Sequence, residues 1–390
     1  MDEIRKQLEK WASEGKTNSW MANSLGVGDS TVARWLKKWN IKKKTRQVKI
    51  KEVKEEVQED TRLHRLRARE SALSKKYKVA IDQNEGLEKM LEATLGMKTG
   101  VKTTKIKKRK NTGKSESTIV VVASDWHIEE EVRPESLAGD TSNTYNLEIS
   151  KKCSEHFFRT ALMLTEIESQ HTNINTMVVA LLGDFVTGNL IDEMLEITLL
   201  EPAEAIVRAT EYLQSGLQFL LDNSDLDLIV QCHTGNHGRF TKKTHVSTEY
   251  GNSYETLMYV FLANYFKDEP RITFNIPKSY HSLLQIYDWT IRFHHGHAIR
   301  GGQGIGGIAS PIMRKIAKWD TSQRVDHDVF GHFHQLIDGN KFLVNGSMIG
   351  YNPYAVQIGA SVEAPAQLFF GIHSERGKFV TRPILFPKRS

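Results

Sequence analysis

Residues 118–127 read TIVVVASDWH, and this stretch decides the fold of the larger part of the chain. The run from Thr118 to Ala123 is typical of a buried β-strand, and it ends directly before two ligand-type residues, Asp125 and His127. In an open α/β sheet, residues that follow the carboxyl ends of strands line the functional rim. The stretch therefore predicts a central strand that delivers an aspartate and a histidine to such a rim.

The same arrangement returns further along the chain. Apolar runs end directly before polar clusters at Met177 to Leu182 with Gly183-Asp184, Leu226 to Cys232 with His233 to His237, Trp289 to Phe293 with His294 to His297, Val329-Phe330 with Gly331 to His334, and Lys341 to Val344 with Asn345-Gly346. Helical stretches such as Leu147 to Ile167 and Pro202 to Leu221 are expected to cover the sheet faces. The repetition predicts an α/β sandwich with one ligand-rich edge.

The clustered residues have the chemistry of a metal site. Asp125 and His127 can both turn toward one cation where the strand becomes a loop, and the glycines before Asp184 and Asn236 let the backbone approach closely. Mixed oxygen and nitrogen donors suit Mn²⁺, Fe or Zn²⁺ better than Ca²⁺. Two such metals about 3.5–4 Å apart can bridge a hydroxide and hold a phosphate during its displacement.

The order of these motifs carries a family resemblance. The motifs are Asp125-x-His127, Gly183-Asp184, Gly235-Asn236-His237, His295-Gly296-His297 and Gly331-His332-x-His334. Together they resemble the calcineurin-like metallophosphoesterase superfamily over residues 118–390, including its DNA exonuclease and endonuclease branch. The resemblance implies a four-layer α/β/β/α sandwich with a dinuclear metal centre, most simply two Mn²⁺ ions, with Fe, Zn²⁺ or Mg²⁺ as alternatives.

The resemblance also implies a role for each matching residue. One metal would be held by Asp125, His127 and His334, the bridge would be Asp184, and the second metal would be held by Asn236, His295 and His332. His237 resembles the family's histidine that positions the scissile phosphate and protonates the leaving oxygen.

Two positions depart from the family pattern or leave a choice. The family often has an acidic residue after the Asn-His pair, whereas this chain has Gly238-Arg239, so we expect Arg239 to face the substrate. Among His294, His295 and His297, we expect His295 to be the ligand, because residues 294 and 295 face opposite sides of an extended strand. His297 is the alternative that contacts phosphate instead.

Charge divides the chain into two unlike parts. Residues 1–117 contain 30 Lys+Arg and 16 Asp+Glu, a net charge of +14, which leaves −8 for residues 118–390. Of the 15 histidines, 14 lie in the acidic part. Cations neutralise phosphates, while carboxylates and imidazoles hold metals. The split therefore predicts a nucleic-acid-binding segment attached to a metal site.

Residues 1–46 are predicted to form a small all-α helix-turn-helix domain. Three short helices are expected, with apolar positions at Leu8, Trp11, Trp20, Met21, Leu25, Val32, Trp35 and Leu36, and with Asp29 or Ser30 capping the third. The stretch NSLGVGDSTVARWLKKW resembles recombinase and transposase helix-turn-helix segments. The expected DNA contacts are Ser30, Thr31, Arg34, Lys37, Lys38, Lys42, Lys43 and Lys44. The alternative is a helical bundle that only packs.

The two segments between these domains are charged. Residues 47–99 predict a long helix that is either half of a homodimeric coiled coil or a solvated spacer, because its heptad pattern drifts. Residues 100–117 are rich in lysine and predict a flexible basic linker, with a domain boundary near Ser117.

The substrate must be inferred separately, since one fold hosts many activities. We expect a metal-dependent hydrolase that cleaves DNA phosphodiester bonds with a metal-activated hydroxide and is brought to DNA by its N-terminal domain. The alternatives are a phosphatase or phosphodiesterase of proteins or small molecules, and a non-catalytic DNA-binding regulator. The absence of a long apolar run or an apolar start predicts a cytoplasmic protein without membrane contact, and the arrangement suits a phage or mobile-element protein in a bacterial cell.

Overall fold

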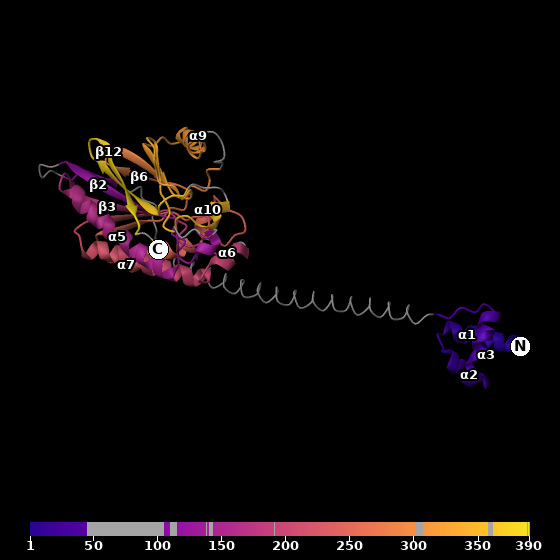
Figure 1. Ribbon diagram of the computed structural model, residues 1–390. Coiled ribbons are helices and arrows are strands. Elements are labelled where there is room, and N and C mark those ends of the chain that lie inside the picture. Colours follow the sequence, from indigo (N-terminus) through magenta and orange to yellow (C-terminus); the bar gives the residue numbers. More distant parts are fainter. Residues whose placement is uncertain are drawn as a thin grey trace. The chain divides into compact units, whose positions relative to one another are not determined.

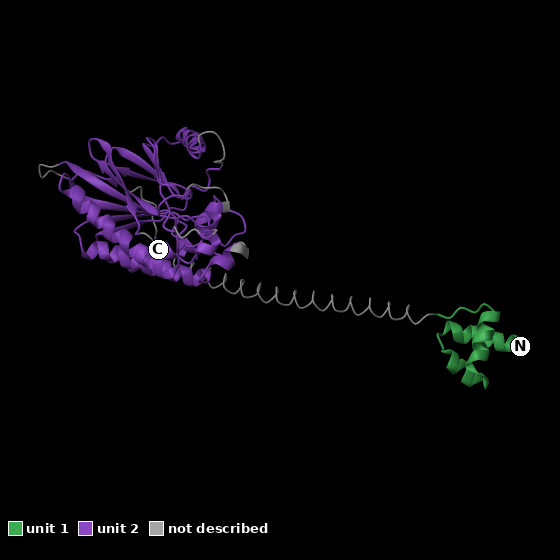
Figure 2. Ribbon diagram, viewed as in Figure 1, with its two compact units in different colours: residues 1–93 green, residues 94–390 purple. Residues whose placement is uncertain are grey.

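The computed structural model describes residues 1–44, 105–109, 115–137, 139, 143–190, 192–300, 307–357, 362–387 and 389. The chain divides into two compact units, Met1–Ala93 and Thr94–Ser390 (Figure 2). Within the described residues, no helix has both the length and the apolar character needed to cross a bilayer.

The N-terminal unit contains the three predicted helices (Figure 1). They are α1 (Asp2–Ser13), α2 (Asn18–Leu25) and α3 (Asp29–Lys38). Their small core consists of Leu8, Ala12, Met21, Ala22, Val32 and Leu36. Trp20 was expected in this core but is 43% exposed, with the Lys16 ammonium 4.6 Å from its ring centre. Alanines at positions 12 and 22 fill the interior instead, since three short helices enclose little volume.

The turn between α2 and α3 differs from the prediction in one detail. Gly26 ends α2 with a left-handed φ of 66°, which a residue with a side chain adopts at a cost. The cap of α3 is Gly28, which has no side chain to offer, so the prediction of a cap at Asp29 or Ser30 was wrong. The carboxylate of Asp29 accepts a hydrogen bond from Ser19 on α2 instead and ties the two helices together.

The C-terminal unit is built on two six-stranded mixed sheets (Figure 1). The first sheet has the order β12 (Gly377–Leu385), β11 (Ala366–His373), β2 (Glu116–Ala123), β3 (Asn173–Leu181), β4 (Asp227–Cys232) and β5 (Ile272–Asn275). The second sheet has the order β1 (Lys105–Ile106), β6 (Ser282–Ile286), β7 (Trp289–Phe293), β8 (His327–Phe330), β10 (Phe342–Val344) and β9 (Ile337–Asp338). Strands β2, β3, β4 and β5 run parallel, as do β7, β8 and β10.

Helices cover the outer faces of both sheets. The long helices α5 (Leu147–Ser169), α7 (Pro202–Asp222) and α8 (Tyr254–Tyr265) share a core with the first sheet, and α9 (Ala309–Asp320) packs on the second. Short helices lie in the connections: η1 (Pro134–Leu137), α6 (Asp192–Ile197), η2 (Glu249–Asn252) and α10 (Pro353–Gln357). The bounds of α5 and α7 agree closely with the predicted helical stretches.

Alternating side chains on the central strands separate two cores. On β2, Val121 packs toward α5 and α7, while Val120 and Val122 pack against the second sheet. Opposite them, Leu284 and Phe293 of the second sheet close the space between the two sheets. Every residue of β2 is buried, as the apolar run predicts. The order of layers is helix, sheet, sheet, helix, so the predicted α/β/β/α sandwich is confirmed.

The segment predicted as a basic linker is partly structured. Lys105–Ile106 form β1, which pairs in parallel with Gln285 and Ile286 of β6. Lys108 forms an ion pair of 2.8 Å with Glu375, and Arg109 pairs with Asp227. Residues 105–109 are thus attached to the sandwich by the pairing of β1 with β6 and by ion pairs with acidic side chains. The predicted helix over residues 47–99 lies outside the described residues.

Candidate metal centre

Five strands of the two sheets deliver the predicted ligands to one rim. Asp125 and His127 follow β2, Asp184 follows β3, and Asn236 follows β4. The second sheet contributes His295 after β7, and His332 and His334 after β8. The ligand-type atoms of neighbouring members lie within 4.8 Å of one another in three overlapping groups: Asp125-His127-His334, His127-Asp184-His237 and Asp184-His295-His332. The structure therefore brings the predicted Asp and His ligands together around Asp184.

The backbone of this rim is strained at the candidate ligands. Among the described residues, the non-glycine residues with positive φ include Asp125 (56°), His127 (47°), Asp184 (53°), His332 (71°) and His334 (54°). A left-handed backbone costs an L-residue about 1–2 kcal/mol. Such strain persists where the surrounding fold imposes it, and it is concentrated at functional sites. The sharp turns at the ends of β2, β3 and β8 are therefore what aim these side chains inward.

Two glycines are required because carboxylates lie against them. A side-chain carbon at Gly235 would collide with the Asp184 carboxylate, and one at Gly331 would collide with the carboxylate of Asp125. The backbones that precede Asn236 and His332 thus touch the two aspartates directly. His332 N also donates to Asp125 Oδ2 at 3.0 Å, so the rim is closely packed around both aspartates.

The first ligand group is Asp125, His127 and His334. His334 Nε2 lies 3.4 Å from Asp125 Oδ1, and the rings of His127 and His334 have their centres 5.2 Å apart. His127 Nδ1 lies 3.0 Å from the Thr187 hydroxyl, while its Nε2 is buried and has no partner. A buried nitrogen without a partner is unfavourable unless something else binds it. The His127 ring is therefore oriented to offer Nε2 to a cation.

The second ligand group is centred on Asp184 and His295. His295 Nε2 lies 2.8 Å from Asp184 Oδ2 and 3.2 Å from Asn236 Oδ1. His295 Nδ1 donates to the Leu182 carbonyl at 2.7 Å, which fixes the ring and leaves Nε2 facing the two oxygens. His332 completes the group, with its ring centre 5.1 Å from that of His295. Nitrogen and oxygen donors at these distances fit a divalent cation of the Mn²⁺, Fe or Zn²⁺ type.

Charge and burial set the protonation of these groups. Burial alone would raise the pKa of Asp184, but the charges on His295 and His237 and the hydrogen bond from His295 hold it well below its ordinary value. The Asp184 carboxylate outweighs burial and raises the pKa of His295 to about 10. Burial, with the neighbouring His237 and His334, lowers the pKa of His127 well below its ordinary value. His127 thus carries a free lone pair at neutral pH, whereas a cation bound by His295 would displace the proton that its Nε2 shares with Asp184.

His237 lies beside the ligands and is half-buried. Its backbone N donates to Asp184 Oδ1 at 2.7 Å, and its ring centre is 4.8 Å from that of His127. Its Nδ1 donates to the carbonyl of Thr187 at 3.2 Å, so Nε2 is the nitrogen left free. This placement suits a group that handles a proton at the edge of the centre.

The three neighbouring histidines of residues 294–297 have different surroundings. His294 points away from the centre, stacks on Phe330 at 4.7 Å and lies 3.5 Å from Asp328. His295 points into the centre, so the two residues do face opposite sides. The side chain of His297 is buried, with its ring centre 5.5 Å from that of His295 and its Nε2 3.6 Å from Glu249 Oε1. Of the three, His295 alone belongs to the ligand groups of the described residues.

Arg239 is engaged with the chain's own backbone. Its guanidinium donates to the carbonyl of Asn236 and, through Nε, to that of Thr241 at 3.1 Å. It is half-buried, and burial lowers its pKa. In this arrangement Arg239 fixes the loop that carries Asn236 and His237.

Several buried residues that support the centre were missed by the sequence analysis. Thr187 contacts His127 and also donates to Glu130 Oε2 at 3.1 Å. Glu129 accepts hydrogen bonds from the backbone of Thr187 and Gly188, and burial raises its pKa to about 7. Glu129 and Glu130 directly follow the Asp-x-His motif and its isoleucine, so their position was a signal, although glutamates in sequence are usually exposed.

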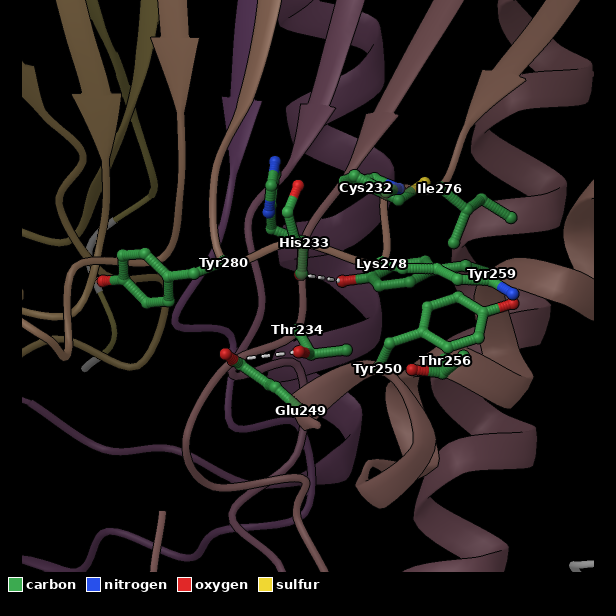
Figure 3. A pocket seen from close by; sticks show the side chains of 12 residues that line it. Cys232, His233, Thr234, Glu249, Tyr250, Thr256, Tyr259, Ile276, Lys278 and Tyr280 are labelled. Carbon is green, nitrogen blue, oxygen red and sulfur yellow. Dashed lines mark hydrogen bonds between the residues drawn. The ribbon is translucent and has the colours of Figure 1, made fainter. Parts of the chain in front are cut away.

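A small pocket, partly open to solvent, lies between the end of β4 and the β5–β6 connection (Figure 3). Glu249 and Tyr280 on its wall also border the centre, since both lie close to His297. Inside it, Thr234 donates to Glu249 at 3.0 Å. Lys278 lies over the Tyr250 ring at 5.5 Å. The wall thus offers a carboxyl, an ammonium and aromatic faces next to the centre.

Comparisons with solved structures give matches at low identity and low TM-score. No protein-family model matches the chain, and no curated protein matches it. A conserved uncharacterized protein from Streptococcus pneumoniae, described as a predicted phosphoesterase, is 10% identical; the alignment covers 68% of this chain and 97% of that one, with a TM-score of 0.26. Vacuolar protein sorting 29 from Cryptosporidium parvum is 13% identical, covering 70% and 100%, with a TM-score of 0.29. A novel phosphatase from Mycoplasma pneumoniae is 11% identical, covering 70% and 93%, with a TM-score of 0.28.

Proposed function

We propose that this protein is a metal-dependent phosphodiesterase of the calcineurin-like metallophosphoesterase type, and that its substrate is DNA. The observation that carries the proposal is the pair of ligand groups on either side of Asp184, Asp125-His127-His334 and Asp184-His295-His332. Two adjoining sites that share a rim suit a phosphoester, whose oxygens need charge neutralised on both sides of the broken bond.

Two divalent cations, Mn²⁺ in our proposal, would be held by these groups together with Asn236. When bound, such a pair neutralises phosphate charge and lowers the pKa of a water. The chain contributes fixed orientation: Thr187 aims His127, the Leu182 carbonyl aims His295, and the turns with positive φ hold the aspartates.

His237 and Arg239 serve the substrate side in this proposal. With Nδ1–H bonded to the Thr187 carbonyl, His237 Nε2 is the atom that would give a proton to the leaving oxygen. Arg239 keeps His237 in place through the Asn236 carbonyl and adds a positive charge near the phosphate.

The N-terminal unit supplies DNA affinity in the proposal. Six of the eight candidate contacts are exposed, namely Ser30, Arg34, Lys37, Lys38, Lys42 and Lys44. Thr31 and Lys43 are half-buried, and Lys43 donates to the Asn18 side chain, so they contribute less. A cationic surface binds phosphates, and a tether raises the local concentration of DNA at the metal centre. A homodimer through residues 47–99 would double this effect.

The test uses the purified full chain with Mn²⁺ on supercoiled DNA, linear DNA, a bis-aryl phosphodiester and an aryl phosphate monoester. We expect cleavage of DNA and the diester, abolished by EDTA. Nicking of supercoiled circles would mark an endonuclease, and degradation of linear DNA alone an exonuclease. Hydrolysis of the monoester with intact DNA would favour a phosphatase, and DNA binding without any hydrolysis would favour a regulator.

A further inference from the structure

One buried carboxylate joins two of the ligand loops from behind. Glu255 lies in the first turn of α8 and is fully buried. Its Oε1 accepts a hydrogen bond from Phe185 N at 2.7 Å, and its Oε2 accepts one from Gly235 N at 2.6 Å. Phe185 directly follows Asp184, and Gly235 directly precedes Asn236. A single side chain therefore sets the spacing of the loops after β3 and β4.

We propose that Glu255 is a positioning residue of the metal centre, which acts through these two backbone N–H groups to hold Asp184 and Asn236 at the spacing that a cation needs. The proposal rests on the metal centre proposed above and does not depend on DNA being the substrate. Groups that orient metal ligands from outside typically change metal affinity by about 10–100-fold when they are replaced.

Packing alone does not account for a carboxylate at this position. Burying a carboxylate is unfavourable unless hydrogen bonds compensate it, and none of the ion pairs among the described residues involves Glu255. An apolar side chain would fill the space, but it would leave Phe185 N and Gly235 N without partners. The two oxygens are thus matched to two donors that flank the ligands.

Gly238 shows how closely the fold is built around this carboxylate. A side-chain carbon at Gly238 would lie 2.8 Å from Glu255 Cγ and 3.1 Å from its Cδ. Gly238 does not have a positive φ, so its backbone does not require glycine. The Glu255 side chain itself occupies the place where a side chain at 238 would go. If Glu255 were truncated, a short acidic side chain at 238 would enter the space that the Glu255 side chain leaves.

The first experiment is Glu255→Gln, read by Mn²⁺ titration of the full-length protein in a calorimeter. Glutamine keeps the volume but turns an amide NH₂ toward one of the two donors. We expect the affinity for one of the two Mn²⁺ ions to fall by about 10–100-fold while the other is retained. Glu168→Gln is the matched control, because Glu168 is also buried but pairs with Arg382 near the amino end of β3, away from the rim.

Wild-type affinity for both ions in Glu255→Gln would overturn the proposal. An equal loss in Glu168→Gln would overturn it as well, because the loss would then follow from general destabilisation. Thermal unfolding without metal measures the stability of each variant separately. Since Mn²⁺ alone is the probe, a failure of this proposal stays distinct from a failure to cleave DNA.

The second experiment moves the carboxylate to the neighbouring loop. Glu255→Ala should lose Mn²⁺ affinity. Adding Gly238→Asp to this variant should raise its Mn²⁺ affinity again by at least about tenfold. Rescue by relocation is not expected from a residue that only fills space. A double variant that binds Mn²⁺ no better than Glu255→Ala contradicts the proposed role of this carboxylate.

Discussion

The two units of the chain place their charged side chains in opposite ways. The N-terminal helices keep Arg34, Lys37 and Lys38 on the surface, with a core of only six small or medium apolar residues beneath. The C-terminal sandwich buries Asp125, Asp184 and His295 completely at the ends of its strands. Exposed charges act at a distance and tolerate loose geometry, whereas buried charges need fixed partners. Our proposal follows this difference, since it assigns DNA binding to the exposed charges of one unit and chemistry to the buried charges of the other.

The largest expected effect is at Asp184, the bridge in our proposal. Asp184→Asn removes one negative charge from between the two ligand groups, so we expect loss of most bound metal and nearly all hydrolysis, with the fold retained. Elemental analysis of the purified variant measures the metal, and circular dichroism measures the fold. Two metals per chain in this variant would show that Asp184 is not the bridge.

His237→Ala tests chemistry separately from metal binding within the buried unit. We expect both metals to remain and turnover on DNA to fall by about 10²–10⁴-fold, the usual contribution of a general acid. Turnover of a bis-aryl diester, whose leaving group needs no proton, should fall less. If turnover of the aryl diester falls as much as turnover of DNA does, His237 does not protonate the leaving oxygen.

Removal of residues 1–44 tests the exposed unit, and it leaves β1 and the sandwich intact. With about six phosphate contacts, the full chain should lose about 10³-fold in DNA affinity between 50 and 200 mM salt. The DNA affinity of the shortened chain, which lacks these contacts, should fall far less over the same range. Hydrolysis of the aryl diester should be unchanged. Coinciding salt curves for the two proteins would remove DNA targeting from the N-terminal unit.

The smallest effect concerns the pH dependence of stability in the metal-free protein. Burial lowers the pKa of His294 to about 4, and of His297 and His332 to about 3, so their unfolded forms bind protons below about pH 6.5 when the folded forms do not. Each such histidine lowers the free energy of unfolding by about 1.4 kcal/mol per pH unit as the pH falls toward the folded pKa.

Buried glutamates act in the opposite sense at higher pH. Burial raises the pKa of Glu129 to about 7 and of Glu249 to about 8, so these two groups partly offset the loss of stability from the histidines until the pH falls below about 4.5. Residues 1–44 contain no histidine. Calorimetry of the metal-free chain at pH 6 and pH 4 should therefore show a larger downward shift for the sandwich than for the helices. Equal shifts would contradict this origin of the pH dependence.

The sequence predicted the rim well because its signals are local. Each buried strand and the ligand after it, such as β2 with Asp125 or β3 with Asp184, are adjacent in the chain. Strand β12 was not predicted, since it lies at a sheet edge, is largely exposed and contains Pro383, which edges tolerate. Glu255 was missed for another reason: its partners Phe185 and Gly235 meet it only through the packing of α8.

In the helical unit, the helices were predictable from the sequence but the function of their surface was not. Its three helices follow from periodicity, but Trp20 is 43% exposed and lies edge-on against Trp11, with ring centres 5.2 Å apart. The positions of exposed lysines follow from the helix register, yet nothing in a register states what those lysines contact. Surface function is therefore the part that sequence and fold constrain least.

The left-handed turns at Asp125, His127, Asp184, His332 and His334 have a consequence for folding itself. Together they disfavour the native state by several kcal/mol, at about 1–2 kcal/mol for each residue. A cation that binds only the folded chain adds stability in proportion to the logarithm of its concentration. The strained rim therefore makes metal supply a determinant of how much of this protein stays folded, and the melting temperature of the sandwich should rise steadily with added Mn²⁺.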